Sequence, residues 1–583
     1  MCGICGYIGD NVKENLLEKL SLLEYRGYDS CGVAFFQDNN IKVIKSIKKI
    51  EDLSEKLLNY EIKNIGIGHT RWATHGITSE ENAHPHISPN NVWAVVHNGI
   101  IENFEEIKSK YLQNVVFRSQ TDTEVIPCLL EQNENSIYSF ITTCNILKGS
   151  FAICAINKNN PNCLYLAKNQ SPLFVGKIGD KVLCASDTYC FENFPQYYEM
   201  KDFEFALCRK EKITFFDKKG KIIFKEPIVN KVNKYFSINK KFKYFMEKEI
   251  NEIPLCIDNI VNYYSKNQIS LNFDIKEIDN IKLIGCGSAY HTALIGEKYL
   301  KKALNIEINT YIASEFRYSI NHITKNTLCI FVSQSGETAD TIACLKQVKN
   351  KCKTLSIVNA ENSTLRFLSD NSLFMLCGKE IAVATTKAFV SGTIILYLLA
   401  NYFKNKEFCI QKKNIIKLKN NIKKFIKEDV YTEKLSDDLL NKKDCFFIGR
   451  DIDYPLQLEA GLKLKEISYI NCLSIPSGEL KHGSIALIDN NSIVFASVTQ
   501  KKLLEKNISN IKEIEARKGR VILLTTIKDV SRPFDIIKFN HINDDLDVLQ
   551  LVVFYQLLAY KVCIKKNLSP DKPRNLAKSV TVE

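Results

Sequence analysis

Residues 328–348 read LCIFVSQSGETADTIACLKQV, an apolar run followed by a Ser/Gly loop and then by a helical pattern. We predict a strand over 328–332 and a helix over 337–348. A short buried strand that leads through a small-residue loop into a long helix is the repeating unit of a parallel sheet with crossover helices. This stretch therefore predicts an α/β fold for the part of the chain around it.

The same pattern recurs on both sides of this stretch. The further strand and helix predictions are 281–285 with 288–302, 445–449 with 454–468, and the apolar runs 492–497 and 520–525. Residues 280–405 and 440–570 therefore look like two copies of one α/β unit, although they share few identical residues.

The front of the chain, residues 2–240, has many short apolar runs instead. They fall at 31–36, 65–68, 92–96, 151–156, 163–167, 173–176, 182–185 and 213–216, with helical patterns at 11–25 and 122–131. We expect a layered α/β module rich in antiparallel sheet. The lysine-rich segment 217–245 loses the alternation and is predicted to be a linker, and a helix over 244–265 opens the second half.

Length and composition limit the class of protein. A chain of 583 residues exceeds a single core, which stops growing near ~250–300 residues, so we expect two to four domains. The net charge of +13, from 79 Lys+Arg against 66 Asp+Glu, comes mostly from scattered lysines. Because no block of arginines with interleaved aromatics occurs, we expect an anionic small substrate and no nucleic acid.

The 20 cysteines are spread over the chain, many of them inside apolar runs, which favours buried free thiols over a disulfide framework. The first residues lack a basic segment followed by an apolar run, and no stretch approaches the ~20 apolar residues of a membrane span. We expect a cytoplasmic protein that does not enter a membrane.

Cys2 is the first candidate for chemistry. The chain begins Met1-Cys2-Gly3-Ile4-Cys5-Gly6, and a small second residue normally permits removal of Met1. The freed α-amino group, with a pKa near ~7.7–8.0, could then take the thiol proton of Cys2. The alternative is that Cys2 and Cys5 form a redox or zinc pair, but the strand-to-helix context and the second cysteine pair that these need are missing.

Three segments support the nucleophile hypothesis: residues 24–30 (EYRGYDS), 68–76 (GHTRWATHG) and 96–99 (VHNG). Singly, their histidines are more often structural, and Asn98-Gly99 is more often a hairpin turn. Together they closely resemble the glutaminase domain of class II, N-terminal-nucleophile glutamine amidotransferases. The resemblance implies an oxyanion hole at Asn98 and Gly99, and a glutamine site built from Arg26, Arg71, Thr74, His75, His84 and Asp122.

In the back half, the loops 285–289 (GCGSA) and 333–338 (SQSGET) each lie between a predicted strand and a helix, where backbone N–H groups attract anions. An ordinary Ser/Thr helix cap is the alternative. On the helix 454–468, Glu459, Lys463 and Glu466 fall on one face, which predicts either a solvated ion pair or acid and base groups at a cleft. Lys578 lies in a polar tail that has no obvious place in either core, and could form a Schiff base with a sugar carbonyl.

The motifs SQSGET, VATTKAF (383–389), LEAGLKLKEISYI (458–470), GELKHG (478–483) and PRNLAKSVTVE (573–583) extend the resemblance to the whole chain. The chain is similar to the isomerising glutamine–fructose-6-phosphate aminotransferases. That family makes glucosamine 6-phosphate, the first step towards UDP-N-acetylglucosamine, without metal or cofactor, as a homodimer or larger homo-oligomer.

The resemblance implies an N-terminal-nucleophile glutaminase fold (αββα layers) over 2–235, a linker and helix over 236–275, sugar-isomerase domains over 276–410 and 435–570, and a catalytic tail over 571–583. Lys578 would form the imine, Glu466 move a proton between C1 and C2 with support from Lys463, and His482 of a neighbouring subunit assist ring opening. Trp72 would gate an ammonia channel. The sugar-phosphate site would comprise Gly287, Ser288, Ser333, Gln334, Ser335, Thr338, Val383, Thr385 and Ala577.

The sequence departs from the family pattern at Ala289 and Ser484, where serine and proline are usual, and the short join at 217–245 leaves regulation by phosphorylation in doubt. Two other functions remain open. Another amidotransferase of the same glutaminase class should carry a phosphoribosyl or pyrophosphate loop after residue 245, and none is found. A non-catalytic sugar-phosphate sensor would not need Cys2, Glu466, His482 and Lys578 together.

Overall fold

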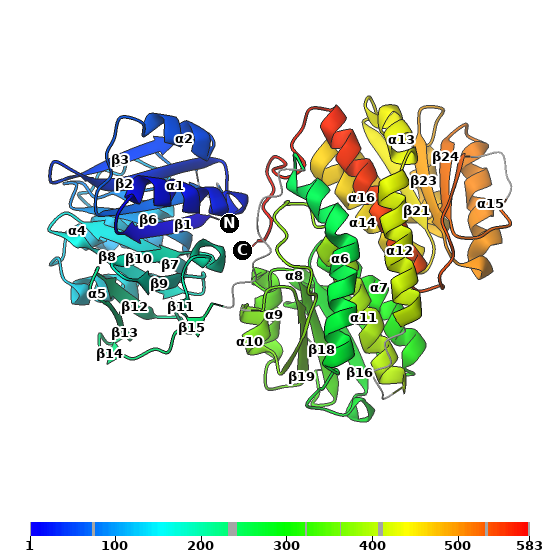
Figure 1. Ribbon diagram of the computed structural model, residues 1–583, viewed down its shortest axis with the longest axis horizontal. Coiled ribbons are helices and arrows are strands. Elements are labelled where there is room, and N and C mark those ends of the chain that lie inside the picture. The colour runs from blue at the N-terminus through cyan, green and yellow to red at the C-terminus, as the bar shows by residue number, and fades with distance from the viewer. Residues whose placement is uncertain are drawn as a thin grey trace. The chain divides into compact units, whose positions relative to one another are not determined.

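The computed structural model describes residues 2–72, 76–230, 242–320, 323–361, 363–405, 412–530 and 535–580. The chain divides into two compact units, Met1–Ile238 and Asn239–Thr581. Figure 1 shows the first unit in blue to green-cyan and the second in green to red.

The first unit contains two antiparallel sheets. The larger has eight strands in the order β15 (Ile228–Val229), β11 (Gln196–Glu199), β9 (Phe174–Ile178), β10 (Lys181–Ala185), β1 (Gly3–Ile8), β4 (Ile65–Arg71), β2 (Ser30–Gln37), β3 (Asn40–Ser46). The other has seven, in the order β14 (Ile222–Ile223), β13 (Ile213–Phe216), β12 (Glu204–Cys208), β8 (Asn160–Asn169), β7 (Gly149–Asn157), β6 (Trp93–Ile101), β5 (His86–Ile87).

Three apolar clusters hold these sheets between helices. One cluster, with Ile4, Val96 and Leu166, joins the inner faces of the two sheets. The outer face of the larger sheet packs on α1 (Val12–Leu23) and α2 (Ile50–Lys56). The outer face of the other packs on α3 (Phe104–Tyr111), α4 (Val125–Glu131) and α5 (Ile137–Ile146). The expected αββα layering is therefore confirmed.

The predicted linker over 217–245 is wrong in its first part. Strands β14 and β15 lie within it. β14 is an edge strand of the seven-stranded sheet, and β15 is an edge strand of the eight-stranded sheet. β14 is the return strand of a hairpin, whose turn is closed by Gly220 N donating to Asp217 O at 2.9 Å. Strands of two residues are too short to show alternation in the sequence, so lysine content dominated the prediction.

The second unit contains two parallel sheets of five strands with the same topology. The first has the order β17 (Glu307–Ile312), β16 (Asn280–Gly285), β18 (Thr327–Ser333), β19 (Lys353–Val358), β20 (Asn371–Phe374). The other has the order β22 (Asn471–Pro476), β21 (Asp444–Gly449), β23 (Ile493–Val498), β24 (Arg520–Thr525), β25 (Asp535–Lys538). The identical strand order confirms the predicted duplication.

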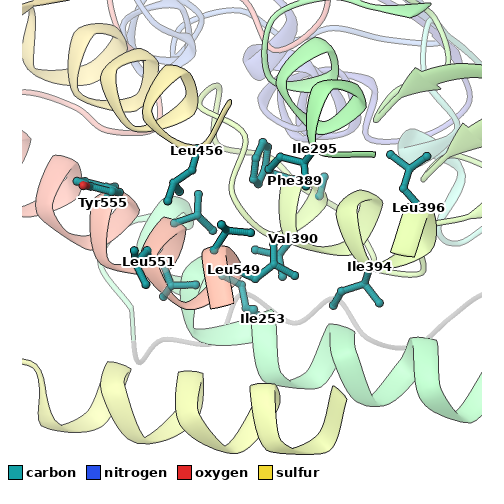
Figure 2. Packing of buried hydrophobic residues seen from close by; sticks show 14 of the residues in the cluster. Ile253, Ile295, Phe389, Val390, Ile394, Leu396, Leu456, Leu549, Leu551 and Tyr555 are labelled. Atoms are coloured by element: carbon teal, nitrogen blue, oxygen red, sulfur yellow. The ribbon is translucent and has the colours of Figure 1, made fainter. Parts of the chain in front are cut away.

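Long helices connect the strands and fill the space between the two sheets. The unit's helices are α6 (Phe245–Lys266), α7 (Ser288–Ala303), α8 (Ala313–Phe316), α9 (Ala339–Val348), α10 (Thr364–Leu368), α11 (Lys387–Asn405), α12 (Lys412–Glu428), α13 (Tyr431–Leu439), α14 (Asp453–Ser468), α15 (Leu504–Glu515) and α16 (Asp547–Lys565). Figure 2 shows Ile253, Phe389, Leu456 and Leu549 meeting between α6, α11, α14 and α16. One shared core therefore fixes both α/β copies to each other.

Helix α16 is the one helix among the described residues that is long and apolar enough to cross a membrane, contrary to the sequence prediction. However, 83% of its most apolar stretch is buried inside this unit. Its apolar content is accounted for by the shared core, in which every face of the helix contacts protein. Among the described residues, no group of three or more His, Cys, Asp or Glu side chains is placed to hold a metal ion.

The C-terminal tail, which had no predicted place, docks on this unit at several points. Asp571 accepts hydrogen bonds from Phe245 N and Met246 N, both at 2.8 Å, at the start of α6. Further along, Ala339 N donates to Val580 O at 3.0 Å, and Ser335 Oγ lies 3.0 Å from Ser579 Oγ. The tail therefore runs from the start of α6 to the start of α9.

Replacing Asp571 with alanine should loosen this tail. Two N–H groups of the first turn of α6 would lose their acceptor, which costs about 1–2 kcal/mol of unfolding free energy. Thermal denaturation should show the lower stability, and hydrogen exchange should show faster exchange in residues 571–580. Exchange in the tail at the wild-type rate would contradict this anchoring role.

Candidate active sites

Cys2 lies directly before β1, half-buried, where three elements meet. Its Sγ accepts a hydrogen bond from Trp72 N at 3.3 Å, at the end of β4. Its carbonyl oxygen accepts from Asn98 Nδ2 of β6 at 2.8 Å and from Arg26 Nε at 3.2 Å. Arg26 is held in turn by Asp187, with Nη1 and Oδ2 2.9 Å apart. The predicted oxyanion amide therefore contacts the backbone of the residue that carries the thiol.

The orientation of the Asn98 amide is fixed from both ends. His69 Nε2 lies 3.0 Å from the backbone oxygen of His97 and 3.1 Å from Asn98 Oδ1. A carbonyl oxygen only accepts, so His69 Nε2 carries the proton and Asn98 turns its oxygen toward it. Burial lowers the pKa of His69 to about 3, which keeps the ring neutral. The NH₂ group of Asn98 is therefore left facing Cys2.

Gly99 is required by its backbone. Its φ of +136° lies in a region that L side chains rarely adopt, and a Cβ there would be 2.0 Å from Ser150 O. Only glycine lets β6 approach β7 this closely at the position beside Asn98. The Asn-Gly pair is thus part of a strand, and the hairpin-turn alternative is wrong.

Arg71 and Asp122 supply opposite charges near the thiol. Both are buried, and Asp122 Oδ2 accepts from Ile101 N at 2.6 Å. Burial lowers the pKa of Arg71, and Cys2, Asp29 and Asp122 partly offset this effect. A guanidinium and a carboxylate close to a thiol can hold the two charged ends of an amino acid.

The other predicted residues of this site differ in their placement. His84 is buried, accepts from His97 N at 3.3 Å through Nδ1, and stacks on His69 with ring centroids 4.0 Å apart. Thr74 and His75 lie outside the described residues. Cys5 is fully buried within β1, where burial raises its pKa, so it belongs to the core.

The second unit contains a cavity of about 440 Å³ at the carboxyl ends of β16 and β18. Its lining includes most of the residues predicted for the sugar-phosphate site. These are Gly287, Ser288, Ser333, Gln334, Ser335, Thr338, Val383, Thr385, Glu466, Ala577 and Lys578. Ala289, the position that departs from the family pattern, also lines it.

Two strand-to-helix loops form one wall of this cavity. Gly287 precedes α7, and Ser288 is its first residue. Ser333 ends β18, and its Oγ accepts from Gly336 N at 3.0 Å, which folds the loop back on itself. Gly336 has a φ of +66°, and a Cβ there would be 2.2 Å from Ser363 Oγ. The loop therefore keeps its hydroxyl groups at the cavity because glycine permits the tight turn.

The tail also lines the cavity and carries Lys578. Its Nζ donates to Glu380 Oε2 at 2.5 Å and lies 3.5 Å from Thr385 Oγ1. The side chains of Lys578 and Glu380 are 3% and 0% exposed. Glu380 was not predicted from the sequence, although it lies only three residues before the start of the VATTKAF motif.

Helix α14 supplies a row of charges at the cavity, in which Glu459 and Lys463 are buried and Glu466 lines the cavity. Lys463 Nζ lies 2.7 Å from Glu466 Oε2, 3.3 Å from Glu459 Oε1 and 3.1 Å from Ser288 Oγ. Burial alone would lower the pKa of Lys463, but Glu459 and Glu466 outweigh it and hold the pKa above its usual value. The solvated ion-pair alternative is therefore wrong, and Lys463 stays charged beside Glu466.

Two histidines of the second unit differ in whether the sequence predicted them as site residues. His291 Nδ1 lies 2.8 Å from Glu459 Oε2 and was not predicted, since a lone histidine on a helix carries no pattern. His482 is exposed in a 3₁₀ turn and is not part of the cavity lining of this chain. Its predicted role from a neighbouring subunit stays a prediction.

The comparisons with known proteins agree with this arrangement. Residues 69–193 match the glutamine amidotransferase domain family, and residues 274–402 and 438–533 match the SIS domain family. The fold and the sites thus define an amidotransferase joined to sugar-isomerase-type domains.

Full-length relatives define the family further. The chain is 40% identical to glutamine–fructose-6-phosphate aminotransferase [isomerizing] of Fusobacterium nucleatum and 37% identical to that of Staphylococcus aureus, over 100% of each chain. The C-terminal domain of the Francisella tularensis glucosamine-fructose-6-phosphate aminotransferase superposes with a TM-score of 0.53 at 31% identity, covering 58% of this chain and 100% of that chain. The chain belongs to the isomerising glutamine–fructose-6-phosphate aminotransferase family.

A second buried acid near Lys578 makes the stability of the protein depend on pH. Glu249 of α6 accepts from Ile381 N and, at 3.2 Å, from Ala382 N. Burial, with repulsion from Glu380, raises the pKa of Glu249 to about 8 from 4.5. The folded protein then holds a proton that the unfolded chain has lost at neutral pH.

Unfolding free energy should therefore fall as the pH rises from about 4.5 and should level off above about 8. Glu249→Gln removes this ionisation, so its stability should vary less with pH and exceed that of the wild type at the alkaline end. Chemical denaturation across this range measures both curves. Parallel curves for the two proteins would show that Glu249 does not titrate in the folded state as described.

Proposed function

We propose that this chain transfers the amide nitrogen of L-glutamine to D-fructose 6-phosphate and isomerises the product to D-glucosamine 6-phosphate, releasing L-glutamate. Family membership over the full length supports the overall reaction. The observation that carries the proposal is the cavity of the second unit, where Lys578, Glu466 and the 333–338 loop meet. An amine, a carboxylate and an anion-binding loop are what imine formation and isomerisation of a sugar phosphate require.

In the glutaminase half, we propose that Cys2 attacks the side-chain amide of glutamine after removal of Met1. The NH₂ group of Asn98 donates to the backbone oxygen of Cys2 at 2.8 Å, and would stabilise the developing oxyanion together with the backbone at Gly99. Arg71 would hold the carboxylate of the amino acid and Asp122 its ammonium group. We assign Arg26 to ordering the Cys2 carbonyl, and Thr74, His75 and His84 to the remainder of the glutamine site.

In the sugar half, Lys578 would form an imine with the open-chain ketose. Glu466 would move a proton between C1 and C2, and the ammonium group of Lys463, whose pKa is held high, would support it from 2.7 Å away. The hydroxyl groups of Ser333, Ser335 and Thr338 would bind the phosphate. Ser288 is committed to Glu459 and Lys463 through its Oγ, at 2.9 and 3.1 Å, so it would reach the phosphate through its backbone N–H.

The remaining assignments rest on the family resemblance. Trp72 would open a path for ammonia between the two reactions, and His482 would act from a neighbouring subunit, which makes the functional form at least a homodimer. We also propose a cytoplasmic location and no metal or cofactor. The join that the sequence predicts between the glutaminase domain (2–235) and the isomerase domains (276–410 and 435–570) would let one chain use the ammonia it makes.

Two substitutions separate the half-reactions. Cys2→Ala should abolish synthesis of glucosamine 6-phosphate from glutamine but spare sugar-phosphate isomerisation, because the cavity of the second unit is untouched. Lys578→Arg should spare glutamine hydrolysis and stop aminosugar formation, because a guanidinium does not form the imine. Coupled assays of glutamate release and aminosugar formation measure both. Glutamine-dependent synthesis by Cys2→Ala at the wild-type rate would refute the proposal.

The departure at Ala289 gives a gain-of-binding test. Ala289→Ser adds a hydroxyl at the cavity wall, and one further charge-assisted hydrogen bond to phosphate is worth about 1.5–3 kcal/mol. Affinity for fructose 6-phosphate should rise by about tenfold or more, measured calorimetrically. Ala289→Gly is the matched control without a hydroxyl, and equal affinity of Ala289→Ser and wild type would remove Ala289 from the phosphate site.

A further inference from the structure

Lys578 must lose a proton before it can act, and the structure provides one acceptor for that proton. An ammonium group has no lone pair, so the reacting form of the lysine is the neutral amine. The carboxylate of Glu380 is hydrogen-bonded to Nζ at 2.5 Å, and both side chains are buried. Water that could accept the proton is largely excluded from this pair.

Glu380 is held for this contact by its other oxygen. Oε1 accepts from Thr386 N at 2.8 Å and from Ala388 N at 3.1 Å, at the start of α11. Its other oxygen, Oε2, is therefore aimed at Lys578. Thr385, which lies between Glu380 and Thr386 in the sequence, lines the cavity. The carboxylate is fixed, and it faces the amine from the side away from the cavity.

The charges around the pair favour an ionised Glu380 before the reaction. Glu249 of α6 and Lys387 of α11 belong to the same cluster of charges as Glu380 and Lys578. Lys387 Nζ lies 2.7 Å from Glu252 Oε2, and the thiols of Cys256 and Cys377 are also close to Lys387. Burial raises the pKa of Glu380, but Lys578 and the N–H groups at 386 and 388 outweigh this, so its pKa lies below the usual value. An ionised Glu380 is therefore the form that faces Lys578 before the reaction.

We propose that Glu380 is the proton acceptor of the sugar half-reaction, which converts Lys578 from ammonium to amine and later returns the proton. This inference rests on the imine role of Lys578 proposed above. A sugar phosphate entering the cavity excludes more water, and a less polar environment favours the neutral acid and amine over the ion pair.

The step balances in atoms and charge. A proton passes from Nζ to Oε2, and the nitrogen lone pair attacks the C2 carbonyl carbon while the carbonyl electrons move to oxygen. A second proton passes from nitrogen to that oxygen and gives a neutral carbinolamine. The C–O bond then breaks, the leaving hydroxyl takes the Glu380 proton by way of the Thr385 hydroxyl, 3.5 Å from Nζ, and water departs. Ammonium, carboxylate and ketone become iminium, carboxylate and water.

Glu380→Gln tests this step in the full-length protein. The amide oxygen can keep the bonds to Thr386 N and Ala388 N, so the turn is preserved while the proton acceptor is lost. The measurement is the rate at which borohydride traps fructose 6-phosphate on Lys578, followed by mass spectrometry as a function of pH. Glu252→Gln is the matched control, because it removes a neighbouring carboxylate that does not touch Lys578.

In the wild type, the trapping rate should be flat across neutral pH, because the proton stays within the pair. In Glu380→Gln the rate should fall by about a hundredfold or more and rise with pH, because the proton must leave for solvent. Glu380→Asp should give an intermediate rate and keep the flat profile. Glu252→Gln should match the wild type in trapping rate, pH profile and substrate affinity.

Two results would overturn the inference. One is a Glu380→Gln protein with the wild-type rate and profile, which would leave Glu380 only as an anchor of the tail. The other is a trapping rate of the wild-type protein that rises with pH across the neutral range. This measurement does not depend on whether any variant folds. Absence of any trapped adduct in the wild type would instead refute the proposed imine at Lys578.

Discussion

The buried contact between Lys578 and Glu380 is the interaction on which the sugar-phosphate site depends. The tail has few apolar side chains of its own, so it is held by polar contacts: Asp571 at α6, Lys578 at Glu380 and Val580 at α9. Without the tail the cavity would lose Lys578, the one lysine among its described lining residues. Breaking one partner of a buried ion pair is costly because it strands a charge, typically by about 3–5 kcal/mol. The same contact therefore holds the amine that we propose to react and keeps the tail at the cavity.

The duplicated architecture explains why one cavity draws on both α/β copies. The two sheets share a strand order, and their central helices pack into a single core. Helix α14 belongs to the second copy, yet its Lys463 reaches Ser288 at the start of α7 in the first. A loop from one copy thus supplies the wall proposed to bind the phosphate, and a helix from the other supplies the groups proposed to act as acid and base.

Much of the fold and many of the site residues could be predicted because their sequence patterns are local. Strand, small-residue loop and helix follow one another within about twenty residues at 328–348, and buried parallel strands appear as continuous apolar runs. The residues that define each site are carried by short motifs, from NG at 98–99 to SQSGET. The strands β14 and β15 were missed because two residues carry no periodicity, and α16 was underestimated because polar side chains interrupt its apolar run.

Glu380, Glu249 and His291 show what local patterns cannot reveal. Each acts through a partner far away in the chain: Lys578, the backbone at 381–382 and Glu459. A single acidic residue or histidine looks the same in the sequence whether it is solvated or buried against an opposite charge. Only the tertiary fold, which brings the tail and α6 to the start of α11, makes these groups part of the chemistry.

We propose that nitrogen passes from glutamine to the sugar within this one protein. The most direct measurement supplies glutamine with heavy nitrogen at its side-chain amide, together with fructose 6-phosphate and excess unlabelled ammonium, and determines the isotope in the product by mass spectrometry. The account predicts glucosamine 6-phosphate that carries the heavy nitrogen in proportion to the glutamate released. Aminosugar labelled only to the level of the bulk ammonium, or no aminosugar at all, would contradict it.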